Sequence, residues 1–325
     1  MTALVMGASG FLGSHVTRQL ARRGDDVRVL LRRTSDTRGI DGLDVERCYG
    51  DLFDDDGLRA AMTDVDVLYY CVVDARAWLR DPGTLFSTNV EGLRRVLDMA
   101  LATGIEKFVF TSTVGTLAAG TDRPVTEEDE ADWTGGGPYI ESRRAAEALV
   151  LEYARTRGLP AVAMCVSTTY GPGDWQPTPH GGALAMVAAG RFPFYFGYSL
   201  EVVGIEDAAR AMLLAAEKGR IGERYIISDR FMSSQELHAV AAEAGGVRAP
   251  RIGIPLPVLY AGARINDLAA RVVNRDLPFA TAGLRIVENM GRLDHSKAVR
   301  ELGWQPEPVR DSIQRAVRFF ADRGR

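Results

Sequence analysis

Cysteine, histidine and lysine are scarce in this sequence of 325 residues. The three cysteines are an odd number, and Cys71 and Cys165 lie in apolar runs, so we expect buried, reduced thiols instead of a disulfide framework. The four histidines are scattered without the spacing of metal ligands, and we expect no metal site. Only three of the 39 basic residues are lysine, so arginine supplies almost all of the positive charge.

The sequence also lacks a long apolar run and a surplus of basic charge. No stretch reaches the roughly 18 apolar residues of a membrane-spanning helix. The N-terminus enters a strand-like run directly, without a basic and then apolar signal segment. The net charge of −4, with interspersed signs, provides no basic stripe for nucleic acid. We therefore expect a cytoplasmic protein whose partner is a small molecule.

The chain begins with a glycine motif that directly follows an apolar run. After residues 3–6 come Gly7, Gly10 and Gly13, and residues 14–20 continue with helical apolar spacing. Glycine permits the sharp turn, the approach of the backbone to phosphates and the close packing of helix on sheet. The unpaired N–H groups of a helix N-terminus favour the pyrophosphate of a dinucleotide. The predicted contacts in this loop are Gly7, Ser9, Gly10, Phe11, Leu12 and Gly13.

Strand-like apolar runs then alternate with helical patterns, which predicts an α/β fold with a doubly wound parallel sheet of Rossmann type. These runs lie at 27–31, 45–48, 67–72, 108–112 and 161–166. After Tyr170 the composition shifts to proline, glycine and aromatic residues. We expect a dinucleotide-binding domain over 1–170, joined by a returning strand near 224–228. A smaller, less regular substrate-binding region is expected over 171–325.

The end of the second predicted strand indicates which cofactor binds. A carboxylate there would bind the ribose 2′-hydroxyl of NAD, and a basic side chain would accept the 2′-phosphate of NADP. Arg32 and Arg33 follow the strand, and guanidinium groups suit a phosphate. NADP is therefore favoured, while Asp36 keeps NAD open. Asp51, after the third strand, is placed to contact the adenine, although aspartate is also a common turn residue.

Further motifs make the chain resemble the extended short-chain dehydrogenase/reductase family, also described as NAD-dependent epimerases/dehydratases. Besides the glycine motif, they are Asp51-Leu52, Asn89 to Gly92, Thr111 to Thr113, Tyr139 to Arg143, Tyr170 to Gly173, Glu206 to Ala209 and Leu302 to Trp304. The resemblance covers nearly the whole chain. Within the family the chain looks most like the branch of dihydroflavonol reductases and hopanoid-associated sugar epimerases. That likeness rests on Arg32 to Asp36, Asp81-Pro82 and Gly171 to Pro179.

The resemblance implies a catalytic set with one departure from the family pattern. Thr113, with Ser112 as its competitor, would bind the substrate oxygen, and Tyr139 would transfer the proton. Arg143 stands where the family has a lysine that holds the nicotinamide ribose. Four residues are about one helical turn, so the Arg143 cation is expected to lower the pKa of Tyr139. Because a guanidinium does not replace an ammonium conservatively, catalysis is either retained or attenuated.

The resemblance also implies further cofactor contacts and an assembly. The contacts are Leu52, Cys71, Val72, Val73, Asn89, Thr111, Tyr139, Arg143, Val166 and Thr168. For Asn89, a structural role inside its helix is an equal alternative. A homodimer through the helices that carry Asn89 and Tyr139 is left open.

The less regular half of the chain bears on the substrate. A set of aromatic residues there is expected to line a cleft for an apolar or aromatic ketone or aldehyde; they are Trp78, Tyr170, Trp175, Phe192, Phe194, Tyr195 and Phe196. Val114 replaces the acidic residue of sugar-nucleotide dehydratases, and an Arg-Tyr-Phe-Asn run typical of sugar epimerases is missing. The leading interpretation is an NADPH-dependent carbonyl reductase. The alternatives are a sugar epimerase, an enzyme similar to 3β-hydroxysteroid dehydrogenase, and an attenuated dinucleotide-binding protein.

Overall fold

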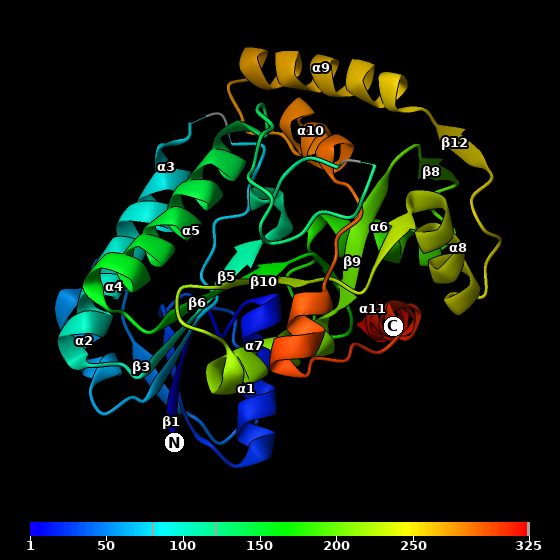
Figure 1. Cartoon of the computed structure of the whole chain (residues 1–325). Coiled ribbons are helices and arrows are strands. Elements are labelled where there is room, and N and C mark those ends of the chain that lie inside the picture. Colours follow the sequence, from blue (N-terminus) through cyan, green and yellow to red (C-terminus); the bar gives the residue numbers. More distant parts are fainter. Residues whose placement is uncertain (80, 121, 324–325) are drawn as a thin grey trace.

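A seven-stranded parallel sheet forms the centre of the protein (Figure 1). The structure is a computed structural model that describes residues 1–79, 81–120 and 122–323. In sheet order the strands are β10 (Arg224–Ile227), β6 (Ala161–Val166), β5 (Lys107–Thr113), β4 (Val67–Tyr70), β1 (Thr2–Met6), β2 (Asp26–Leu31) and β3 (Glu46–Tyr49). This order reverses between β1 and β4, which confirms the predicted doubly wound Rossmann-type fold.

Helices cover both faces of this sheet, so successive strand residues are buried on opposite sides. On one face lie α1 (Phe11–Arg23) and α7 (Ile205–Lys218), and on the other α2 (Asp55–Met62), α4 (Leu93–Thr103) and α5 (Gly137–Arg157). Val5 packs with the first group and Leu4 with the second. The short α3 (Gly83–Phe86) and a π-helical turn (Ser87–Gly92) lead into α4. Burial on both faces explains why these strands read as continuous apolar runs.

The smaller region is built mostly from residues after β6. Its strands are β7 (Thr168–Tyr170), β9 (Ser199–Gly204) and β11 (Arg230–Ser233) in one sheet, and β8 (Phe194–Phe196) with β12 (Ile252–Ile254) in a pair. Its helices are α6 (Pro179–Ala188), α8 (Ser234–Ala244), α9 (Leu256–Val272), α10 (Thr281–Asn289) and α11 (Val309–Arg323). The helices α6, α8 and α11 share an apolar core with β9, while α9 forms the upper rim in Figure 1, above α10.

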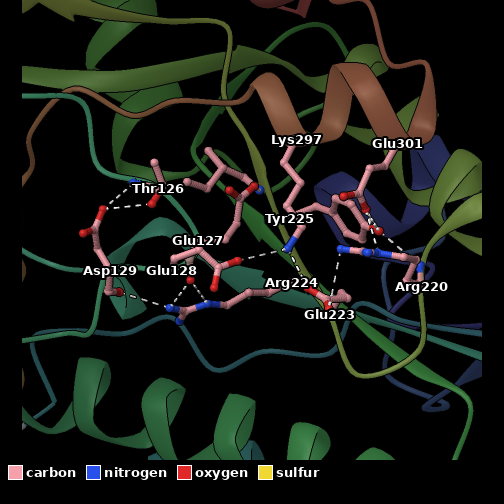
Figure 2. A network of polar contacts seen from close by, with 11 residues as sticks. Thr126, Glu127, Glu128, Asp129, Arg220, Glu223, Arg224, Tyr225, Lys297 and Glu301 are labelled. Carbon is pink, nitrogen blue, oxygen red and sulfur yellow. Dashed lines mark hydrogen bonds and ion pairs between the residues drawn. The ribbon is translucent and has the colours of Figure 1, made fainter.

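A polar network ties the C-terminal segment to the edge strand β10 (Figure 2). Arg224 donates from Nε to the Glu127 carbonyl at 2.8 Å, and Lys297 pairs with Glu223 at 2.6 Å. The Glu127 carboxylate accepts the Ile226 N–H at 2.8 Å. These bonds join the segments around Glu127 and Lys297 to the β10 edge of the sheet.

Candidate functional site

The glycine turn between β1 and α1 is packed too tightly for side chains. Gly7 has φ +82°, and a Cβ there would lie 2.7 Å from the backbone of Cys71. A Cβ on Gly13 would lie 2.2 Å from the Gly7 carbonyl oxygen. Within the described chain, the N-cap Gly10 offers no side-chain hydrogen bond, and the first turn of α1 has no acidic residue. The N–H groups of this turn are therefore available to an anion, which fits a dinucleotide pyrophosphate.

The predicted cofactor residues gather at one edge of the sheet, because the carboxyl ends of parallel strands meet there. Cys71 donates its N–H to Met6 at 2.9 Å, and the Thr111 hydroxyl contacts the Cys71 sulfur at 3.4 Å. The strand predicted over 67–72 ends at Tyr70, because Cys71 and Val72 cross over Gly7. Val73 follows them at the surface, while Val166 ends β6 and Thr168 begins β7.

The loop after β2 leaves its arginines exposed and its carboxylate occupied. Arg32 and Arg33 are both exposed, and the Arg33 guanidinium lies over the Tyr49 ring. Asp36 accepts from Arg38 at 2.9 Å, and this bond lowers the pKa of Asp36 to about 2. A carboxylate already held by arginine is less suited to a ribose hydroxyl.

Asp51, which is predicted to contact the adenine, and Leu52, another predicted cofactor contact, follow β3. Asp51 is exposed and accepts the Phe53 N–H at 3.2 Å, which is the turn role of an aspartate. Leu52 packs against Gly92, where a Cβ would approach its side chain to 2.8 Å. The close contact of Leu52 with Gly92 links this loop to the π-helical turn.

Tyr139 lies near the start of α5, next to the end of β5. Burial raises the pKa of Tyr139, and the Asp74 carboxylate adds to this, while the Arg143 cation and a side-chain hydrogen bond with Thr113 lower it. The expectation of a lowered pKa was wrong for the protein without ligands, because desolvation of the phenolate outweighs the nearby cation. The phenol is therefore held in its protonated form.

Arg143 is 1% exposed, which is unusual for an arginine. Its Nη2 donates to the Thr111 carbonyl, and its guanidinium lies over the Phe110 ring at 5.1 Å. Nε and Nη1 are buried without a partner among the described residues. Unsatisfied buried donors are costly and call for an explanation. The two hydroxyls of a ribose are able to accept hydrogen bonds from these two nitrogens.

Ser112 and Thr113 are separated by their places on β5. The Ser112 hydroxyl is 3% exposed and donates to Glu147 on α5, which also accepts from Thr116 at 2.9 Å and pairs with Arg224 at 3.1 Å. Thr113 Oγ1 accepts the Gly115 N–H at 3.3 Å, and its hydroxyl lies close enough to Tyr139 to lower the pKa of the phenol. The Ser112 hydroxyl is thus committed to a buried carboxylate, which leaves Thr113 as the better candidate for the substrate oxygen.

Asn89 uses its side chain to connect two segments. Its Oδ1 accepts the Asp74 N–H at 2.9 Å, and its Nδ2 donates to the Asp74 carbonyl and to Ser142 Oγ, both at 3.0 Å. Asp74 is in turn bonded to Arg76 at 2.8 Å. These contacts assign Asn89 the structural alternative, holding the loop after β4 against α5.

A cavity of about 490 Å³ lies at the N-terminal end of α5. It is lined by Ala77, Trp78, Leu79, Asp81, Pro138, Asp267, Ala270, Arg271, Leu277, Ala280 and Ala282. Pro138 directly precedes Tyr139, so the cavity adjoins the turn of α5 that carries the candidate tyrosine. No motif marks residues 267–282, and the sequence analysis missed them.

The expectation of one aromatic cleft was wrong, because the aromatic residues divide among three places. Trp78 lines the cavity beside Pro138. Trp175 packs against Phe319 on α11 and lies between Arg38 and Arg323. Phe192, Phe194 and Phe196 pack with one another around His238, and Tyr195 lies over Gly253.

Comparisons with known proteins show what the whole chain is similar to. The model of the "NAD dependent epimerase/dehydratase family" matches residues 3–228. The chain is 32% identical to "Sterol demethylase protein B" of Methylococcus capsulatus, over 100% of this chain and 99% of the relative. It is 29% identical to a "Putative dihydroflavonol 4-reductase" of Synechocystis, over 98% and 94%. The crystal structure of gox2253 superposes with a TM-score of 0.87 at 35% identity, covering 100% and 99% of the two chains.

The structure also bears on membrane insertion. Among the residues it describes, no helix combines the length and the apolar character that crossing a bilayer requires.

Proposed function

The chain belongs to the NAD-dependent epimerase/dehydratase family, and from this membership we propose that it is an NADP(H)-dependent oxidoreductase that reduces a ketone or aldehyde of an apolar small molecule. The observation that carries the proposal is Arg143, a buried cation near Tyr139 with two nitrogens that lack partners in the described chain. Donation from Nε and Nη1 to the two hydroxyls of the nicotinamide ribose satisfies both.

The binding of the cofactor is distributed along the sheet edge. The first turn of α1 holds the pyrophosphate, and Arg32 and Arg33 receive the 2′-phosphate of NADP. The pairing of Asp36 with Arg38 supports this preference over NAD. Residues 1–170 with β10 then form the cofactor side, and residues after 171 contribute most of the substrate side.

Each catalytic residue has a separate task in the reduction. The bound nicotinamide supplies a hydride to the carbonyl carbon. Tyr139 donates its phenolic proton to the carbonyl oxygen, and its raised pKa keeps that proton in place beforehand. Thr113 donates a hydrogen bond to the same oxygen as negative charge develops. The Arg143 cation then stabilises the phenolate that remains after the proton transfer.

The substrate class is supported by the cavity and by the relatives. Trp78, Leu79 and Leu277 give the cavity apolar walls that suit a ring system, and Asp81, Asp267 and Arg271 add charged groups able to bind its polar substituents. The two relatives above are named for a sterol and for a dihydroflavonol, both of which contain fused rings.

The name of the sterol relative favours a second candidate. In it the same residues would work in the opposite direction: Tyr139 would first lose its proton, and its phenolate, stabilised by the Arg143 cation, would take the proton of a ring hydroxyl. An epimerase, in contrast, regenerates its cofactor within each turnover.

The test is a turnover assay with aromatic, steroidal and aliphatic ketones plus NADPH, and with hydroxysteroids plus NADP⁺. Stoichiometric NADPH oxidation that Tyr139→Phe abolishes, with NADPH affinity nearly unchanged, is the expected result. Full turnover by Tyr139→Phe would contradict the assignment. Tight NADPH binding with no net turnover in either direction would favour an epimerase or an attenuated binding protein.

A further inference from the structure

Helix α9 carries a stripe of apolar side chains on its outer side, at the rim of the molecule (Figure 1). Val258 is 58% exposed, Ile265 71%, Leu268 62% and Val272 78%. With the exposed Ala261, these residues follow one another at intervals of three and four, so they share one helix face. The inner face is a different one, where Leu259, Ala263 and Ala270 are buried. The helix is therefore apolar on two sides, and only one of them is covered.

Positive charge surrounds this outer stripe. Residues 248–276 contain two acidic residues, Asp267 and Asp276, and five arginines, namely Arg248, Arg251, Arg264, Arg271 and Arg275. No ion pair of these arginines occurs among the described residues, and Asp267 is turned inward, where it accepts the Thr281 N–H. Arg264 and Arg271, seven residues apart on α9, lie along one flank of the stripe, and Arg275 follows the end of the helix.

We propose that α9 docks on the surface of a bilayer that contains anionic phospholipid. An exposed apolar face flanked by arginines is the pattern of a helix that lies in the plane of the membrane interface. Anionic headgroups supply the negatively charged partners that these arginines lack within the described chain. A second copy of the chain would instead bring the same five arginines to the interface.

Docking of α9 would also bring the cavity close to the bilayer surface. Asp267, Ala270 and Arg271 of α9 form part of the cavity wall, so the bilayer surface would lie one helix away from it. An apolar substrate dissolved in the membrane then has a short path to Tyr139. This route rests on the proposed function, whereas docking itself does not.

The test is flotation of the full chain, without cofactor or substrate, on phosphatidylcholine vesicles with and without phosphatidylserine. We expect binding to the mixed vesicles and weaker binding to phosphatidylcholine alone. Ile265→Ser with Leu268→Ser lowers the partition coefficient roughly 100-fold. Arg264→Gln with Arg275→Gln lowers it roughly 30-fold on the mixed vesicles.

Matched controls come from exposed residues elsewhere. Ile221 is 58% exposed and Arg191 is also exposed. We expect Ile221→Ser and Arg191→Gln to bind vesicles at the wild-type level. If the serine variant does not fold, Ile265→Trp serves instead: its emission shifts to the blue on mixed vesicles, and that of Ile221→Trp does not.

Two outcomes would overturn the proposal. Failure of the wild type to float with the mixed vesicles removes the membrane as the occupant, and so does an unshifted emission of Ile265→Trp on those vesicles. The wild type could instead form a dimer and bind no vesicles. If Ile265→Ser with Leu268→Ser then converts this dimer to a monomer, the stripe is the contact with a second copy of the chain. Failure of the reductase assay leaves all of these readouts unaffected.

Discussion

Replacing Arg143 by methionine separates cofactor binding from stability. Methionine keeps an unbranched apolar stem but removes every donor, including the two nitrogens that lack a partner in the described chain. We expect the free energy of unfolding without cofactor to change little, and the affinity for NADPH to fall steeply.

The magnitudes follow from the contacts of the guanidinium. The variant loses a charged hydrogen bond to Thr111, about 1.5–3 kcal/mol, and the contact with Phe110, about 0.5–2 kcal/mol. It regains the cost of two unsatisfied buried donors, about 1–3 kcal/mol each. These terms nearly cancel. With NADPH, two charge-assisted bonds of about 1.5–3 kcal/mol each are lost, which corresponds to a roughly 10²–10⁴-fold weaker Kd.

The neighbouring Arg144 provides a matched control. It also donates to one backbone carbonyl, that of Trp133 at 2.7 Å, lies over one aromatic ring, and has two unpartnered buried nitrogens among the described residues. Urea unfolding and NADPH fluorescence titration of both methionine variants make the comparison. Arg144→Met should keep the wild-type Kd. If Arg143→Met loses several kcal/mol of stability while its Kd for NADPH stays unchanged, Arg143 is a structural cation and the reasoning fails.

Three further predictions concern the cofactor edge. Gly7 and Gly24 have similar φ values, +82° and +84°, but only a Cβ on Gly7 would lie within 3 Å of other backbone atoms. Gly24→Ala should therefore lower the free energy of unfolding in urea by about 1–2 kcal/mol and leave NADPH binding intact. Gly7→Ala should lower the free energy of unfolding further and abolish NADPH binding. Arg32→Ala with Arg33→Ala should weaken NADPH binding roughly 10–100-fold in titration and leave NADH unchanged, and an equal loss for both would contradict the phosphate contact. Burial raises the pKa of Cys71 to about 11, so its thiol stays protonated at pH 8. Alkylation of Cys71, followed by mass spectrometry, should therefore be roughly 100-fold slower in the folded protein than in urea. Because the unfolded thiol ionises first, the contribution of Cys71 to the free energy of unfolding falls as pH rises from about 8.5 to 11.

Local features of the site were readable from the sequence because they depend on short-range backbone chemistry. The turn from β1 into α1 needs glycine at Gly7 and Gly13, where a Cβ would meet backbone. The runs of buried residues alternating with helical patterns determine a parallel sheet, since parallel strands are covered on both faces. The order of strands then places the end of each run at one edge.

The tertiary structure decided the features that depend on residues far apart in the chain. Glu147, from α5, accepts the hydrogen bond of the Ser112 hydroxyl, a contact between residues 35 positions apart. The sign of the Tyr139 pKa shift depends on burial, which spacing does not encode. The cavity wall at 267–282 and the uncovered face of α9 have no sequence motif, because each exists only through what the rest of the fold packs against it.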